Sequence, residues 1–353
     1  MAPTMTAPAI ETVTDLLQRR RRWWVMEYVF WLAAFASYFL MPDKHLILNE
    51  IAIMALFAIS LDLVLGYAGI VSLGHAAFLG MGAYTAGLFA KHINPDPLIG
   101  LAVAAGATTV LGFVSSFLVL RGSDLTRLMI TLGIALILSE VANQLGWLTG
   151  GADGLQGVVM APLLGLFRFD MFGRTAYAYS LITLFVLFVV ARRITNSPFG
   201  LSLCAIRDNP LRAGAIGIPV DRRLIAVYTL AAAYAGVAGG LLAQTSQYAS
   251  LDVLSFERSA DVMLVLVIGG AGYLYGGIIG AIGFKLLQDW LSALTPQYWH
   301  FWIGMILVSL VLIGRQRMTD AVQGPFVMLA QRLGALFGHS GAASTQPAKP
   351  SES

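Results

Sequence analysis

The sequence predicts an all-α integral membrane protein, a polytopic bundle of about ten transmembrane helices with some broken or re-entrant segments. Hydrophobic residues make up 58% of the 353 residues and charged residues only 12%, and the mean hydropathy is +0.75. Soluble domains are much more polar than this. Apolar segments close to the roughly 20 residues that a helix needs to cross a bilayer recur along the chain, which favours helices over the alternating strands of a barrel.

The apolar segments and the turns between them place the ten spans along the chain. Six glycines lie between residues 66 and 87, so we expect the third span to begin with an unwound or re-entrant piece at residues 69–75. The spans are expected at about residues 24–41, 46–65, 69–90, 98–120, 125–145, 177–192, 224–244, 259–268, 277–294 and 301–314.

Positive charge indicates the orientation of these spans. Starting from a cytoplasmic Arg22, even numbers of crossings return Arg121, Arg192 and Arg315 to the cytoplasm, as the positive-inside rule requires. Both termini are then cytoplasmic. The predicted organisation is a cytoplasmic tail (1–22), a transmembrane domain (23–314) and a second cytoplasmic tail (315–353).

A basic interior loop, residues 193–223, is the only long stretch inside the apolar region that has the composition of soluble protein. Two short helical turns are expected on either side of Asn209 and Pro210, the second closed by Gly217 and Pro219. One interpretation is a solvated connector that faces lipid headgroups. Alanine and glycine mixed with charge favour the other, a compact element on which a soluble protein docks.

No enzymatic motif is present, so we expect a protein that is not an enzyme and that uses no cofactor. The chain lacks the G-x-x-x-x-G-K-[ST] phosphate loop, and the glycines of residues 269–277 lack the spacing of a dinucleotide-binding turn. They are better explained by helix packing or a helix break. The five histidines and single cysteine show no metal-ligand spacing. The basic residues flank the spans, which argues against nucleic-acid binding.

Polar residues within the spans are candidates for a translocation path, because such groups face a bundle interior or water. Glu140, Asn143 and Gln144 form a stripe on one helix face, and lining a pathway and joining an interhelical hydrogen-bond cluster are equally open for it. Further candidates are Ser72, His75 and Gln244.

Two other polar groups have expected structural roles. Lys285 and Asp289, four residues apart, are expected to neutralise each other. Asp261 is expected to cap the helix at residues 259–268.

Several segments resemble one known family in matching order between about residues 46 and 314. They are GYAGIVSLGHAAFLGMGAYTAG (66–87), TGGADGL (149–155), PFGLSLCAIRDNPLRAGAIGIPV (198–220) followed by LAAAYAGVAGGLLA (230–243), and LVIGGAGYLYGGIIGA (266–281). They are similar to LivM-type permeases, the membrane subunits of ATP-binding cassette (ABC) importers for branched-chain amino acids.

The resemblance implies a subunit of the bacterial inner membrane with several partners. These are a homologous LivH-type permease subunit, two cytoplasmic ATP-binding subunits and a periplasmic solute-binding protein. It also implies that residues 199–219 carry a coupling helix that inserts into a groove of an ATPase. The residues assigned to this coupling loop are Phe199, Gly200, Arg207, Asp208, Asn209, Pro210, Leu211, Ile216 and Gly217.

In this loop we expect Arg207 and Asp208 to make polar contacts with the ATPase, and Leu211 and Ile216 to fill its groove. The implied function is translocation of branched-chain amino acids or a related small polar solute, by alternating access driven by the partner ATPases. Because the family also serves urea, amides and aromatic acids, those solutes are an alternative.

A secondary transporter coupled to an ion gradient is a rival from another class. Breaks at residues 66–75 and 269–277 fit it, because discontinuous helices are typical of such proteins.

Overall fold

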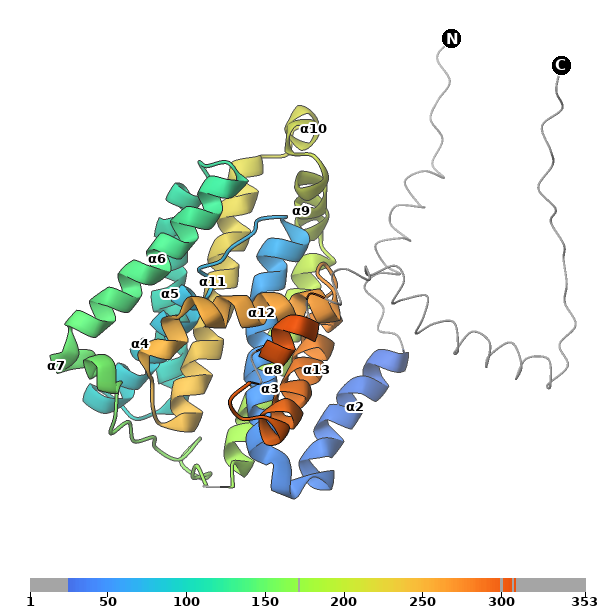
Figure 1. Cartoon of the computed structure of the whole chain (residues 1–353). Coiled ribbons are helices and arrows are strands. Elements are labelled where there is room, and N and C mark those ends of the chain that lie inside the picture. The colour runs from blue at the N-terminus through green and yellow to red at the C-terminus, as the bar shows by residue number, and fades with distance from the viewer. Residues whose placement is uncertain (1–24, 171, 299–300, 307, 309–353) are drawn as a thin grey trace, which may run out of the picture. The chain divides into compact units, whose positions relative to one another are not determined.

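The structure, a computed structural model, describes residues 25–298 except 171, together with 301–306 and 308 (Figure 1). It divides into two units, Met1–Trp290 and Leu291–Ser353. The second unit contributes to the described part only residues 291–298, 301–306 and 308. The predicted cytoplasmic tails, 1–22 and 315–353, therefore lie outside the described residues, as does about half of the predicted tenth span.

The regular secondary structure of the described residues is helical. In addition, the described residues form two isolated β-bridges. The longer helices are α2 (Val25–Leu40), α3 (His45–Asp62), α4 (Ala76–His92), α5 (Pro97–Val119), α6 (Asp124–Gln144), α8 (Arg174–Thr195), α9 (Pro198–Asp208), α11 (Val220–Ser246), α12 (Phe256–Gly269) and α13 (Leu274–Leu294). Short helical pieces are η1 (Pro42–Lys44), η2 (Leu63–Tyr67), α7 (Gly146–Thr149), η3 (Gly151–Asp153), α10 (Pro210–Ala215) and η4 (Leu251–Leu254).

The predicted count of ten spans is not confirmed. Among the described residues five helices are long and apolar enough to cross a membrane, or up to six if the bent pair of α12 and α13 forms one span. The five are Pro42–Tyr67, Pro97–Val119, Asp124–Gln144, Arg174–Thr195 and Val220–Ser246. The predicted eighth and ninth spans correspond to α12 and α13, which form a bent pair with an angle of 111° between the two helices.

Glycine and alanine bring α4, α5 and α11 into close contact at the centre of the first unit. A side chain at Gly82 would meet the backbone of Gly236, and one at Gly239 would meet the backbone of Leu79. A side chain at Gly112 would meet Ala232 in the same way. These small residues let the helices approach closely, which gives dispersion contacts that do not depend on exclusion of water.

Two breaks interrupt the helices, as expected from the glycine-rich segments. After η2, residues 68–75 have no helical structure before α4 begins at Ala76, which confirms the unwound piece predicted there. The second break separates α12 from α13, where Gly270 and Gly272 have φ angles of +99° and +82°. Residues other than glycine rarely adopt these angles. Figure 1 shows α12 lying across the long axis of α11 and α3.

Two expected polar pairings are wrong. Lys285 bonds to Glu50 of α3, with 3.0 Å between Nζ and Oε2, and not to Asp289. The packing of α13 against α3 explains this partner. Gly277 lies against Ala58, and because the two helices are antiparallel, residue 285 lies beside residue 50. Asp261 does not cap α12. The helix begins at Phe256, and Ser255 accepts the hydrogen bond from the Arg258 amide.

Helices α5 and α6 have a broad face that the other described residues leave uncovered. In the most apolar stretch of each helix, 17% of the residues of α6 and 33% of those of α5 are buried. The corresponding share in the segment Pro42–Tyr67 is 83%. The exposed residues of α6 include Leu125, Met129, Leu136, Ile137 and Val141. This face is available to lipid or to another membrane protein.

The contact between α4 and α11 predicts the effect of adding one methyl group. Gly239→Ala should lower the melting temperature of the purified protein in detergent, because the methyl group would overlap the Leu79 backbone and overpacking costs about 1–3 kcal/mol. Gly106→Ala on α5 is the matched control, since nothing lies within 4 Å of a side chain there and alanine favours a helix over glycine by about 1 kcal/mol. Equal melting temperatures for the two variants would contradict the close packing.

Candidate coupling surface and transport path

The interior loop folds as two short helices, and the local sequence explains each boundary. Ser197 accepts a hydrogen bond from the Phe199 amide at the start of α9, with proline at the first helical position. Asn209 ends α9 and caps α10 through a bond from the Arg212 amide of 2.9 Å. Gly217, at a φ of +87°, closes α10 with the Ile218 amide bonded to the Ala213 carbonyl.

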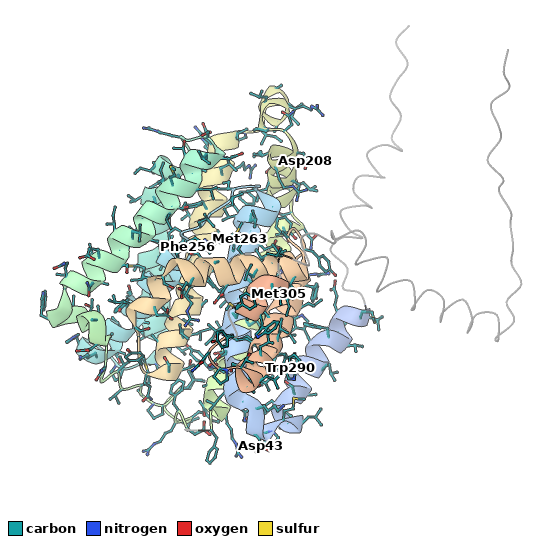
Figure 2. The ribbon with its side chains drawn as sticks, viewed as in Figure 1. Asp43, Asp208, Phe256, Met263, Trp290 and Met305 are labelled. Atoms are coloured by element: carbon teal, nitrogen blue, oxygen red, sulfur yellow. The ribbon has the colours of Figure 1, made fainter. Side chains whose placement is uncertain are left out.

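The outer helix α10 presents large apolar side chains to solvent. Leu211 is 86% exposed and Ile216 is 71% exposed, whereas Ala213 between them is buried. Figure 1 shows α10 as the outermost element at the top of the view, next to α9, and Figure 2 shows Asp208 where the two helices meet. Exposed apolar groups on a polar, basic loop are typical of a surface where another protein docks.

Three of the predicted loop residues instead anchor α9 and α10 to their own chain. Gly200 is buried, and a side chain there would meet the Thr195 backbone. The guanidinium of Arg223 lies 5.2 Å from the centre of the Phe199 ring, a cation–π contact. Asn209 is occupied as a helix cap. The face of α9 beneath them is buried through Leu203 and Ile206.

Arg207 points into its own chain. Its Nη1 donates a hydrogen bond of 2.5 Å to the carbonyl oxygen of Gly66, in the π-helical turn that precedes the first break. Its Cγ passes so close to Gly69 that a side chain there would collide with it. Asp208 lies beside the guanidinium at 3.4 Å and is 72% exposed. The Arg207 side chain is still 40% exposed, so both members of the expected pair of ATPase contacts reach the surface.

Asp62 joins the two helix breaks to each other. Its fully buried carboxylate accepts a hydrogen bond of 2.6 Å from the Gly272 amide in the second break. A side chain at Gly66 would overlap both the Asp62 carboxylate and the Gly272 backbone. We name Asp62, Gly66, Arg207 and Gly272 the break junction. It links α9 to both breaks through side chain to backbone hydrogen bonds.

The sequence prediction of site residues omitted Asp62. The signal that could have found it is a carboxylate one helical turn before the first glycine of a predicted break. A backbone amide released by a break needs an acceptor within the membrane, and Asp62 supplies one.

Ser72 and His75 lie in the first break and are both buried. His75 Nε2 lies 2.9 Å from the Ser60 hydroxyl, and its ring stacks on Phe57 with centroids 5.6 Å apart. The Ser72 hydroxyl and His75 Nδ1 have no hydrogen-bond partner among the described residues. These two groups are therefore buried acceptors or donors with spare capacity, and their place on a path stays a prediction.

Gln244 is fully buried near the end of α11. Its Nε2 donates to the Pro97 carbonyl at 2.8 Å, and its Oε1 accepts from the Tyr179 hydroxyl at 3.1 Å. These bonds join α11 to the start of α5 and to α8. Because both ends of the amide are satisfied within the chain, the geometry favours a structural clamp in this conformation.

The polar stripe on α6 lies on the exposed face of the chain. Glu140, Asn143 and Gln144 are exposed, and Gln144 donates a hydrogen bond of 2.7 Å to Glu140. That bond stays within one helix, so it does not form an interhelical cluster with the described part of the chain. The stripe continues the uncovered face of α5 and α6.

Comparison with known proteins identifies related transport proteins. Residues 45–314 match the profile of a family described as the permease component of branched-chain amino acid transport systems. The chain is 29% identical over 287 residues to the high-affinity branched-chain amino acid transport system permease protein LivM of Salmonella typhimurium, and 27% identical to that of Escherichia coli. The match covers 74% of this chain and 66% of each LivM protein, slightly less than two thirds.

Permeases named for sugars are also similar to this chain. The fructose import permease protein FrcC of Rhizobium meliloti is 25% identical over 76% of both chains. The L-arabinose ABC transporter permease protein AraH of Azospirillum brasilense is 29% identical over 77% of both chains. No solved structure matches the chain.

The break junction predicts an unusual role for one surface-loop arginine. Arg207→Ala should lower the melting temperature in detergent, because a hydrogen bond from a charged group is worth about 1.5–3 kcal/mol and its loss leaves the Gly66 carbonyl without this donor. Arg212→Ala is the matched control on α10, where the side chain is exposed, and it should change stability by less than about 0.5 kcal/mol. Equal melting temperatures for the two variants would argue against the junction.

Proposed function

The chain belongs to the family of permease components of branched-chain amino acid transport systems, and from this premise we propose that it is a membrane-spanning permease subunit of an ABC importer. The observation that carries the proposal is the exposed apolar tip of α10, joined through α9 and the break junction to the interior of the helix bundle. Such an arrangement has a surface for a soluble motor and a physical connection from it to the spans. It requires no covalent chemistry in this chain.

The proposed cargo is a branched-chain amino acid or a related small polar solute. LivM proteins from two bacteria support the amino acid, and the similar sugar permeases keep the solute class open. Urea, amides and aromatic acids remain alternatives. Translocation would proceed by alternating access, with ATP hydrolysis in partner subunits as the energy source.

The proposed assembly contains a LivH-type permease subunit, two ATP-binding subunits and a periplasmic solute-binding protein, in the bacterial inner membrane. The uncovered face of α5 and α6 supports the first of these partners. A polar stripe that includes Glu140 on a largely apolar helix face is better satisfied by another protein or by water than by lipid tails. A similar protein of Methanocaldococcus jannaschii is itself named as a probable LivH permease.

The coupling step can be described in terms of named contacts. An ATPase that holds Leu211 and Ile216 in a groove would move α10 and α9 together, since the face of α9 around Leu203 and Ile206 is firmly packed. Arg207 would carry that displacement to Gly66, and Asp62 would carry it from the first break to the second. Helix breaks are the natural hinges, because residues there lack helical hydrogen bonds.

Removing the apolar tip should uncouple the ATPase without unfolding the permease. Leu211→Glu combined with Ile216→Glu should abolish co-purification of the ATP-binding subunits, because buried anchor residues of an interface are worth about 2 kcal/mol or more each. The variant's own melting temperature should be unchanged, since both side chains are exposed.

Leu166→Glu is the matched control, an exposed leucine in the loop expected on the opposite side of the membrane. Retained assembly and uptake in the double variant would refute the docking assignment.

The two breaks also fit an ion-coupled secondary transporter, and the energy source separates the two functions. Uptake of labelled L-leucine into right-side-out vesicles should require ATP enclosed in the lumen, which is the cytoplasmic side, and should persist when proton and sodium gradients are collapsed. Uptake that follows an ion gradient without ATP would favour the secondary transporter.

A further inference from the structure

An apolar hollow of about 370 Å³ lies between α2, α3, α8 and α13, which are labelled in Figure 1. Its volume falls within the range of about 300–1,000 Å³ that is typical of ligand sites. The wall consists mostly of aliphatic and aromatic side chains, such as Trp31, Ile51 and Leu184. The hollow is open, because the lining residues Met41 and Leu286 are exposed. Lipid tails are as apolar as this wall, so they can enter such a hollow in a membrane-spanning chain.

The length of the hollow matches half the apolar thickness of a bilayer. On α3 the lining residues run from Lys44 to Ala55, and on α13 they run from Ile278 to Asp289. Each stretch rises through 11 residues, which is about 16 Å at ~1.5 Å per residue. The hydrocarbon core of a bilayer is ~30 Å thick, so one leaflet accounts for about 15 Å of it. The hollow is therefore as long as the acyl chains of a single leaflet.

The two ends of the hollow lie at the heights in the membrane that such a chain requires. Lys44 stands at the beginning of the candidate span Pro42–Tyr67, and Ala55 stands at its midpoint. Because α13 is antiparallel to α3, Asp289 lies at the same end of the hollow as Lys44. Trp290, labelled in Figure 2, is 61% exposed, and exposed tryptophans of membrane helices gather at the level of the headgroups. The hollow thus extends from the headgroups to the middle of the bilayer.

The headgroup end of the hollow carries one cation and one anion. Lys44 and Asp289 both line the hollow, and neither side chain forms an ion pair or a hydrogen bond with the other described residues. The other two lining residues that carry a hydroxyl, Ser37 and Tyr177, share a hydrogen bond of 2.7 Å. The charges at this end are therefore available to a ligand, and they match a headgroup that itself carries both signs.

We propose that the hollow binds one acyl chain of a phospholipid whose headgroup is phosphoethanolamine. The Lys44 ammonium pairs with the lipid phosphate, and the Asp289 carboxylate accepts hydrogen bonds from the lipid's primary ammonium. A choline headgroup has no N–H to donate and a glycerol headgroup has no cation, so both leave Asp289 without a partner. The predicted orientation puts Lys44 on the periplasmic side, so the lipid belongs to that leaflet. This inference goes beyond the proposed function, because it concerns a structural lipid and not the cargo.

Native mass spectrometry of the purified complex measures the lipid directly. The full chain with its co-expressed partner subunits is depleted of lipid in detergent and titrated with dioleoyl lipids that differ only in the headgroup. We expect phosphatidylethanolamine to reach half-occupancy at a concentration about three- to fivefold lower than phosphatidylcholine or phosphatidylglycerol, the range expected for partly exposed ion pairs. The bound lipid should also raise the melting temperature, because it binds only the folded state.

A bulky side chain in the wall tests where the acyl chain binds. Ala34→Phe of α2 fills part of the hollow, so it should raise the concentration for half-occupancy by at least about tenfold, because it displaces several methylene groups of the lipid. Ala36→Phe is the matched control, since Ala36 belongs to the same helix and is likewise half-buried but does not line the hollow.

Charge variants test the headgroup without altering the packing, because both charged side chains are exposed. Lys44→Gln and Asp289→Asn should each weaken binding of phosphatidylethanolamine by about three- to fivefold. Asp289→Asn should also remove the preference over phosphatidylcholine. Asp43→Asn is the matched control, an exposed carboxylate beside Lys44 that does not line the hollow.

Three results would overturn the lipid site. Equal half-occupancy for the three headgroups would contradict the roles of Lys44 and Asp289. Equal binding by Ala34→Phe and Ala36→Phe would show that the lipid lies elsewhere on the complex. A complex that binds no lipid in the titration would show that a protein segment fills the hollow instead.

Discussion

Interrupted helices in a membrane protein must find hydrogen-bond partners for their free backbone groups, and this requirement shapes the whole chain. A helix that breaks inside a bilayer exposes backbone groups that lipid cannot satisfy. Here the Asp62 carboxylate accepts a hydrogen bond from the Gly272 amide, and the Arg207 guanidinium donates one to the Gly66 carbonyl. Arg207 reaches the π-helical turn before the first break, and Asp62 reaches the second break. The breaks are therefore stabilised through each other and through α9, and none of the three elements is independent of the other two.

This requirement explains why a surface loop can influence the interior. The helices of the central packing, α4, α5 and α11, contact one another through glycine and alanine with almost no free space, and such packing resists gradual deformation. In the proposed coupling step, the breaks beside this packing would be the places where the backbone changes. Arg207 connects one of them to α9, so that displacement of the loop would act on this break and not on the close-packed helices.

The surfaces left open by the chain differ in chemistry. The face of α5 and α6 is broad and apolar with a polar stripe, the tip of α10 is small and apolar on a basic loop, and the hollow between α2 and α13 is apolar with Lys44 and Asp289 at one end. The proposed second permease subunit and the proposed ATPase would cover the first two of these surfaces. The distribution agrees with a subunit whose function depends on several partners.

Local patterns along the chain were enough to predict much of its secondary structure. Apolar length predicted the helices, glycine density predicted both breaks, and Asn209, Pro210 and Gly217 predicted two short helices in the basic loop, because propensity and capping act within a few residues. These patterns did not predict the count of spans, since the bend between α12 and α13 is set by tertiary packing. Nor could they reveal that Lys285 bonds to Glu50, that Arg207 bonds to Gly66 or that Asp62 bonds to Gly272. Those partners are 235, 141 and 210 residues apart along the chain, and they meet only because the tertiary structure places antiparallel helices and two loops side by side.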